Sequence, residues 1–160
     1  MKTFQDLQEG VYDPNILKAF FLAGGPGSGK SYVVKRGTGG LGLKIVNSDD
    51  VFEKYIKDAG LSMKMPKSEE EPRDKLRDRA KRVTSARQAN YVEGRLGLII
   101  DGTGKDYDKI AKQATQLKQL GYDVHMIFVN TSLETALKRN AERERTVPRS
   151  VATKSWKTVQ

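Results

Sequence analysis

The chain has 160 residues, which is the size of a single domain with enough chain for a proper hydrophobic core. It contains no cysteine, which excludes disulfides and thiolate sites, and no apolar run is long enough to span a membrane. A signal-peptide core is also missing, so we expect a cytoplasmic protein. The formal net charge of +9 favours a polyanionic partner, which is either nucleic acid or simply the phosphates of a nucleotide.

A polar lead-in over residues 1–17 carries a turn signal at Asp13-Pro14. The apolar run at residues 18–23 then predicts a buried parallel strand. Residues 24–31 read Gly-Gly-Pro-Gly-Ser-Gly-Lys-Ser, which is a complete Walker A loop, G-x-x-x-x-G-K-[ST]. A helix is expected from residue 31 to 36, so the loop stands between a strand and a helix, as this motif requires. The alternative is a Gly-Pro-Gly surface turn that happens to be followed by Lys-Ser.

The Walker A loop predicts ATP and Mg²⁺ as ligands. Its glycines let successive backbone N–H groups point at one anion, and the first turn of the next helix adds its positive dipole end. Lys30 reaches the β- and γ-phosphates, while the Ser31 hydroxyl ligates the metal ion. The predicted nucleotide-binding residues are Gly25, Pro26, Gly27, Ser28, Gly29, Lys30, Ser31 and Tyr32.

The rest of the chain alternates between strand and helix patterns. This alternation predicts an α/β fold in one domain, residues 1–160, with a parallel sheet and helices on both faces. His125 stands inside an apolar strand pattern, so we expect it to be a core histidine. After the helix at 31–36 the predicted elements are a strand at 43–47, a helix from Asp49 or Asp50, a loop at 61–72, a charged helix at 72–94, strands at 96–101 and 124–129, helices at 106–120 and 133–145, a break at 147–149 and a short helix through Trp156.

Carboxylates follow two of the predicted strands, at the edge of the sheet where ligands bind in open parallel sheets. Asp49 is our candidate for the base that accepts the proton of an acceptor hydroxyl, with Asp50 as the second choice. An Asp in this place is also a favoured helix N-cap. Asp101 ends an apolar strand and is a candidate for organising Mg²⁺, although Asp-Gly is also a turn signal. Thr103 is an alternative contact for substrate.

Basic residues gather in two places. Arg139 and Arg143 are four residues apart on the predicted helix 133–145, and Arg145 follows. Guanidinium groups on a mobile segment stabilise a transferring phosphoryl group, and the Thr-Val-Pro-Arg break after them suggests a hinged lid over residues 139–149. The other reading is a solvated charged face with interleaved glutamates. The basic run at 73–87 is interpreted as a solvated helix face, or as an acceptor groove.

Three of these motifs together resemble the P-loop kinase group that includes zeta toxins and phage polynucleotide 5′-hydroxyl kinases. The phosphate loop is the first. The second is Asn47-Ser48-Asp49-Asp50, where the resemblance places the general base at the first Asp. The third is Lys138-Arg139-Asn140-Ala141-Glu142-Arg143 before Val147-Pro148, where it implies that both arginines contact ATP phosphates. The match covers roughly residues 18–158 and implies phosphoryl transfer from ATP to a hydroxyl.

The chain departs from that group at two points. Phe52 stands where those kinases usually carry an arginine that contacts the acceptor. They also have a further strand after the lid helices, so we expect the last strand to be absent or the chain to be truncated. The acceptor is therefore a polynucleotide 5′-hydroxyl or a small molecule such as a nucleoside, a nucleotide sugar or a metabolite. A nucleic-acid-associated ATPase and a non-catalytic nucleotide-binding module remain as other readings.

Overall fold

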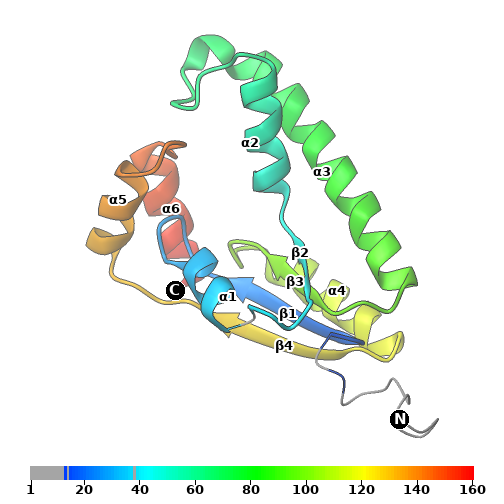
Figure 1. Ribbon diagram of the computed structural model, residues 1–160. Helices are drawn as coiled ribbons and strands as arrows, with labels where there is room; N and C mark the ends of the chain where they lie inside the picture. Colours follow the sequence, from blue (N-terminus) through cyan, green and yellow to red (C-terminus); the bar gives the residue numbers. More distant parts are fainter. Residues whose placement is uncertain (1–12, 14, 38) are drawn as a thin grey trace, which may run out of the picture.

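Four parallel strands form the sheet of the computed structural model, which describes residues 13, 15–37 and 39–160 (Figure 1). All pairings in it are parallel, and the order is β2-β3-β1-β4. The predicted α/β fold is therefore confirmed, while most of the predicted lead-in at 1–17 lies outside the described residues. The strands are β1 (Lys18–Ala23), β2 (Lys44–Val46), β3 (Leu98–Asp101) and β4 (Asp123–Phe128).

Helices follow the strands much as predicted, with three differences. A 3₁₀ helix, η2 (Lys67–Glu69), lies inside the predicted loop 61–72. α3 begins at Glu70 rather than at 72, because proline is tolerated in a first helical turn and Pro72 does not block it. α5 ends at Ala141, about four residues early, for a reason found in the site below. Among the described residues no helix is both long and apolar enough to cross a bilayer. The helices are α1 (Lys30–Gly37), α2 (Ser48–Asp58), the 3₁₀ helix η2 (Lys67–Glu69), α3 (Glu70–Glu93), α4 (Tyr107–Gln119), α5 (Leu133–Ala141) and α6 (Arg149–Val159).

Each face of the sheet has its own core. On one face α4 and the end of α3 cover a cluster built around Phe21 and Leu98. On the other face the short helix α1 contributes Val34, which packs with Leu22 and Ile99. Helices therefore pack on both faces, but α1 has only eight residues and covers less of its face than α3 and α4 cover of theirs.

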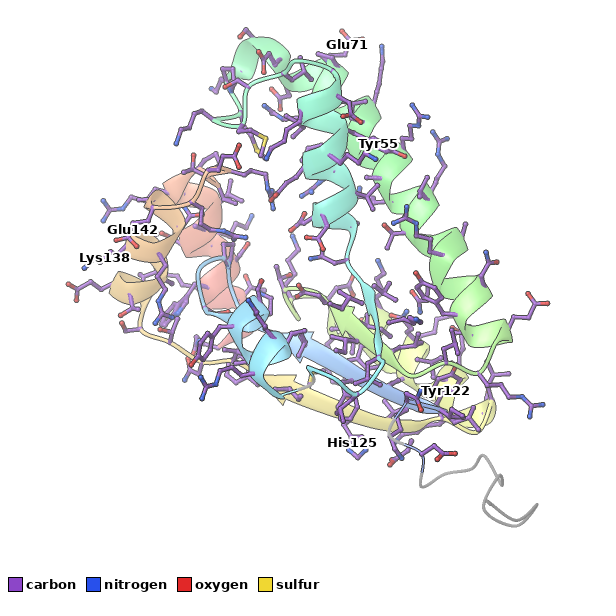
Figure 2. All side chains as sticks on the ribbon, viewed as in Figure 1. Tyr55, Glu71, Tyr122, His125, Lys138 and Glu142 are labelled. Atoms are coloured by element: carbon purple, nitrogen blue, oxygen red, sulfur yellow. The ribbon has the colours of Figure 1, made fainter. Side chains whose placement is uncertain are left out.

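His125 lies where this cover ends, so the expectation of a core histidine is wrong. It belongs to β4, which has a single partner strand among the described residues. Its side chain is 48% exposed and projects outward from the sheet (Figure 2). The imidazole stacks on Phe20 at 5.2 Å between ring centroids and lies 2.9 Å from the Asp123 carboxylate.

α2 and α3 form an antiparallel pair that rises from the carboxyl edge of the sheet (Figure 1). A separate cluster of Phe52, Ile56 and Ala80 holds the two helices together, and all three side chains are buried. α5 and α6 pack together across from this pair, on the other side of the Walker A loop. The first turn of α2 is thereby fixed beside the ends of β2 and β3, where the predicted carboxylates lie.

Candidate active site

The Walker A loop is seated by close backbone packing against α5 and α6. Gly27 has a φ of +81°, and a Cβ there would overlap the backbone carbonyl of Ala136 in α5. Gly25 lies against the backbone of Trp156 in α6, whose indole N–H donates to the carbonyl of Thr131 at 2.8 Å. A side chain at Gly27 would push the loop out of place, because the atoms that it would overlap belong to backbone, and at Gly25 it would be crowded by the Cα and Cβ of Trp156.

The loop presents polar groups that suit an anion. The Ser28 hydroxyl is buried and has no hydrogen-bond partner in the described part of the chain. The Lys30 ammonium donates to the carbonyls of Gly24 and Gly25, at 2.5 and 3.3 Å. A phosphate oxygen is a stronger acceptor for it than a carbonyl, since the bond is then charge-assisted. Burial lowers the pKa of Lys30, Asp101 opposes that shift, and the nearby Arg143 adds to it.

A cavity of about 530 Å³ lies between this loop, the first turn of α2, the end of β3 and the segment after α5. That volume falls within the usual range for small-molecule sites. The predicted base Asp49, the predicted arginines Arg139 and Arg143, and Thr103 all line it. Its charged lining consists of Lys30, Arg77, Lys105, Arg139, Arg143 and Arg145 together with Asp49, Asp50, Glu53 and Asp101.

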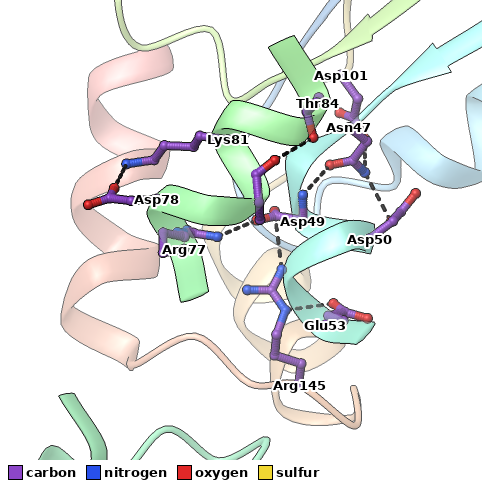
Figure 3. Close-up of polar contacts among 11 residues, drawn as sticks. Asn47, Asp49, Asp50, Glu53, Arg77, Asp78, Lys81, Thr84, Asp101 and Arg145 are labelled. Atoms are coloured by element: carbon purple, nitrogen blue, oxygen red, sulfur yellow. Dashed lines mark hydrogen bonds and ion pairs between the residues drawn. The ribbon is translucent and has the colours of Figure 1, made fainter. Parts of the chain in front are cut away.

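Asp49 is held between two arginines in this cavity (Figure 3). Arg77 of α3 donates to Oδ1 at 2.7 Å, and Arg145 lies 3.1 Å from Oδ2. Burial raises the pKa of Asp49, but Arg145 and Arg77 outweigh it, so that the pKa lies below its ordinary value. The helix cap is Asn47, whose side chain accepts from the Asp49 N–H at 2.8 Å. The Asp49 carboxylate is therefore not needed as a cap and remains ionised in the cavity.

Phe52 supports both arginines that contact Asp49, Arg77 and Arg145, which together form a clamp on this carboxylate. Its ring is buried, with the Arg77 Cζ 4.5 Å and the Arg145 Cζ 6.0 Å from the ring centroid. The position expected to mark a lost substrate contact thus carries an aromatic platform for two guanidinium groups. Sequence reasoning missed Arg77, because the basic run of α3 was interpreted as one face. The available signal was its spacing, since Arg77 lies three residues before the buried Ala80.

Asp50 and Asp101 are joined through the side-chain amide of Asn47. The Asn47 amide donates to Asp50 at 3.2 Å and to Asp101 at 3.1 Å (Figure 3). Burial raises the pKa of Asp50, and Glu53 and Asp49 raise it further. Burial also raises the pKa of Asp101, although Lys30 acts against it. These two carboxylates therefore hold protons more readily than Asp49 does.

The arginines after β4 are held in place by the Asn140–Val147 lock, a pair of hydrogen bonds between these two residues. The Asn140 amide donates to the Val147 carbonyl at 2.8 Å and accepts from the Val147 N–H at 3.1 Å. The chain is thereby drawn back after α5, so the prediction that Arg139 and Arg143 share a helix face is wrong. Both still line the cavity, and an Arg139 Nη1 lies 3.5 Å from the Ser28 carbonyl.

Arg145 has a different environment from Arg139 and Arg143. It is 6% exposed and donates through Nε to Glu53 at 2.6 Å, in addition to its contact with Asp49. The exposed pair Lys57–Glu144, at 2.9 Å, lies beside it. The segment after α5 is thus tied to α2 across the cavity. In the described residues Lys30, Lys105, Arg139 and Arg143 form no ion pair, which leaves four cations for a ligand.

Tyr32 is not brought to the cavity. Its side chain is 65% exposed and lies near Arg36, and its N–H donates to the Gly29 carbonyl. The prediction that it binds nucleotide is therefore not supported by its position. Gly25 packs on α6 rather than lining the cavity, whereas the rest of the predicted loop, residues 26–31, does line it.

Several solved structures share this fold, at sequence identities that show the fold alone. A chain of the Pnkp1/Rnl/Hen1 RNA repair complex matches with a TM-score of 0.67 and 19% identity over 91% of this chain and 44% of its own length. A chain of the PezAT toxin–antitoxin system of Streptococcus pneumoniae matches with a TM-score of 0.63 and 20% identity, over 78% of this chain and 51% of its own length. A chain of the AvrRxo1-ORF1:-ORF2 structure with ATP matches with a TM-score of 0.68 and 16% identity, over 89% of this chain and 47% of its own length.

The chain therefore spans about half the length of these three proteins. No curated protein sequence matches it. The family model for Zeta toxin matches residues 5–160, which is nearly the whole chain.

Proposed function

The chain belongs to the zeta toxin family, and we propose that it is a kinase that transfers the γ-phosphoryl group of ATP to a hydroxyl acceptor. One observation carries the proposal: a single cavity holds a phosphate loop, a carboxylate contacted by two arginines, and two further arginines that form no ion pair with any described residue. Phosphoryl transfer needs little covalent chemistry from a protein, and is catalysed mainly by positioning and by stabilising the developing charge. The phosphate loop and Asp49 are suited to positioning the reactants, and the arginines are suited to stabilising the developing charge.

Each residue has a role that follows from its place. The loop amides and Lys30 bind the β- and γ-phosphates. Arg139 and Arg143 stabilise the negative charge on the phosphoryl group in flight. Asp49 accepts a hydrogen bond from the acceptor hydroxyl, orients it and takes its proton. The arginine pair keeps this carboxylate ionised and aimed into the cavity.

Mg²⁺ fits the residues where the end of β3 meets the first turn of α1. Ser31 and Asp101 both line the cavity and are the residues that would hold it. The described chain contains no group of three or more acidic or histidine side chains suited to a metal. Mg²⁺ commonly binds through one or two protein ligands together with phosphates and water. When bound, the ion neutralises charge on the β- and γ-phosphates.

The acceptor belongs to one of two classes, a polynucleotide 5′-hydroxyl or a small hydroxyl compound. The net charge and the basic α3 support the first. Against it, several charges on α3 are paired in solvent, such as Lys75 with Glu71 and Lys81 with Asp78. A nucleic-acid groove would also release counterions, so oligonucleotide affinity should fall steeply as salt rises.

The direct test is transfer from γ-labelled ATP to a panel of a 5′-hydroxyl oligonucleotide, a nucleoside, a nucleotide sugar and small metabolites. We expect one labelled acceptor, no label with Lys30→Ala, and full labelling with the matched control Lys35→Ala on the same helix. Free labelled phosphate without any labelled acceptor would indicate an ATPase. If wild-type protein neither binds ATP nor releases phosphate, the proposal is wrong. Trp156 provides the binding signal, because the single tryptophan lies against Gly25 of the loop.

A further inference from the structure

We propose that Asn47 is a positioning residue that makes metal binding depend on the nucleotide. Its side-chain amide holds Asp50 and Asp101, and so prevents a divalent cation from binding between these two carboxylates before ATP arrives. This inference rests on the proposed ATP and Mg²⁺ site and adds a form of regulation to it. Three features support it, namely the register of the sheet, the hydrogen bonds of Asn47 and a second cavity that reaches the same carboxylates.

The register of the sheet brings Asn47 and Asp101 together. β2 pairs with β3 in parallel, and Val46 is the partner of Ile100. The residues that follow this pair, Asn47 and Asp101, therefore reach the carboxyl edge of the sheet side by side. The Asn47 Nδ2 donates to the Asp101 Oδ2 at 3.1 Å. Because Asn47 is also the N-cap of α2, one side chain links the end of β3 to the start of that helix.

The backbone of α2 fixes the orientation of the Asn47 amide. The Asp49 N–H donates to the Asn47 Oδ1 at 2.8 Å, and a backbone N–H can only donate, so the amide oxygen must face it. The NH₂ group then faces the two carboxylates, and it donates to Asp50 at 3.2 Å and to Asp101 at 3.1 Å (Figure 3). An amide has two N–H groups, so both donors of Asn47 are used.

The amide nitrogen of Asn47 lies where a cation would bridge the two carboxylates, because one oxygen of Asp50 and one of Asp101 bond to it. Carboxylate oxygens bind Mg²⁺ at about 2.0–2.1 Å. The two hydrogen bonds are longer, so an ion could take the place of the NH₂ group only after Asn47 has moved away. The bond from Asn47 uses Oδ2 of Asp101, and Oδ1 remains as a ligand for an ion that arrives with phosphates.

The two carboxylates can be reached from two directions. Asn47, Asp50 and Asp101 line the cavity of the candidate active site. The same three residues line a second cavity of about 750 Å³, which lies between α1 and β2. An ion in this second cavity would meet the carboxylates without any nucleotide. The Asn47 amide closes this route, because it already occupies an oxygen of each carboxylate.

The role of Asn47 as a helix cap and its role toward the carboxylates can be separated by substitution. Serine and aspartate are about as good at an N-cap as asparagine. Asn47→Ser keeps a cap acceptor and removes both N–H donors. Asn47→Asp keeps the cap and the shape, and places a third carboxylate beside Asp50 and Asp101. The described residues contain no group of three acidic or histidine side chains suited to a metal, so this variant creates one.

The experiment measures Mn²⁺ binding without nucleotide by electron paramagnetic resonance, in which the signal of the free ion falls on binding. Mn²⁺ suits the same oxygen ligands as Mg²⁺. Wild type and the two Asn47 variants are compared with Asp106→Asn, a matched control. Asp106 caps α4 by accepting from the Lys109 N–H at 3.1 Å, and it does not line the cavity. A double variant, Asn47→Ser with Asp101→Asn, tests where the ion binds, and thermal unfolding checks the fold of each protein.

Without nucleotide we expect wild type and Asp106→Asn to leave Mn²⁺ free, and both Asn47 variants to bind it, Asn47→Asp more tightly than Asn47→Ser. Each variant should gain at least tenfold in affinity over wild type, which is worth about 1.4 kcal/mol. The double variant should lose this gain. With a non-hydrolysable ATP analogue present, wild type should bind Mn²⁺ as well.

Two results would overturn the inference. One is a wild type that binds Mn²⁺ without nucleotide as tightly as Asn47→Ser does, and this result needs no variant to be stable. The other is a gain in Asn47→Asp alone, because the added charge would then explain the binding and the amide would not be what excludes the ion. Failure of the kinase proposal has a different sign, which is a wild type that does not bind the ATP analogue.

Discussion

The two sides of the cavity are built by different means. On the phosphate side, one short loop supplies the binding groups, and backbone packing against α5 and α6 holds it in place. Its cations, Lys30, Arg139 and Arg143, line the cavity and form no ion pair within the described part of the chain. On the acceptor side, Asp49 is placed by ion pairs with Arg77 and Arg145, which come from elements far apart in the chain.

The two sides of the cavity should therefore be sensitive to different kinds of substitution. The phosphate side depends on shape, so changes in backbone freedom should damage it. The acceptor side depends on charge balance, so neutral substitutions of the same shape should damage it.

The largest effect is expected at the base. Asp49→Asn keeps the shape but removes the proton acceptor, and loss of a positioned general base typically costs about 10²–10⁴ in rate. Binding of ATP, followed through Trp156 fluorescence, should persist because Asp49 does not touch the Walker A loop. Asp50→Asn is the neighbouring control and should retain most transfer. If Asp50→Asn is inactive and Asp49→Asn active, the base has been assigned to the wrong carboxylate.

The next effect lies in the loop. Gly27→Ala places a methyl group on the Ala136 carbonyl at a φ of +81°, so we expect nucleotide binding to be lost and the protein to be destabilised. Gly60→Ala is the control: it has a φ of +67° with nothing near its Cβ, and it should pay only the left-handed strain of about 1–2 kcal/mol. Equal stability and ATP affinity in the two variants would show that α5 does not seat the loop.

Features encoded by neighbouring residues could be predicted from the sequence, whereas features that depend on tertiary packing could not. The Walker A loop, the strands and Asp49 at the start of α2 were all predicted, because a local motif or a local periodicity encodes them. Arg77 was not, since its partner is 28 residues away and only tertiary packing brings them together. The end of α5 was also missed, because the Asn140–Val147 lock competes with a helix pattern that continues to residue 145. His125 was misjudged because an apolar pattern does not say which face of a sheet is left uncovered.

A smaller effect is expected at the tie between α2 and the segment after α5. Arg145→Gln removes two ion pairs of a nearly buried guanidinium, but the carboxylates are partly exposed, so we expect a loss of about 2–3 kcal/mol in unfolding free energy. Lys57→Gln breaks the adjacent exposed pair with Glu144 and should cost less than about 1 kcal/mol. Denaturant unfolding of both variants measures the difference. Equal losses of unfolding free energy would mean that the ion pairs of Arg145 do not tie α2 to the segment after α5.

The smallest effect is a shift in pH dependence. Asp49 must be ionised to accept a proton, and its two arginines hold its pKa below the ordinary value, so it stays active as a base into more acidic solution than a free aspartate. Arg77→Gln removes one of these cations while Arg145 keeps the other. The pKa of Asp49 should therefore rise, and the acid limb of kcat/KM should move to higher pH. Arg79→Gln should leave the limb in place, because Arg79 lies over Tyr55 and away from Asp49. An acid limb that stays fixed in Arg77→Gln would mean that a different group, such as Asp50 or Asp101, limits the reaction at low pH. In both of those carboxyls burial raises the pKa, so each takes up a proton before Asp49 does as the pH falls.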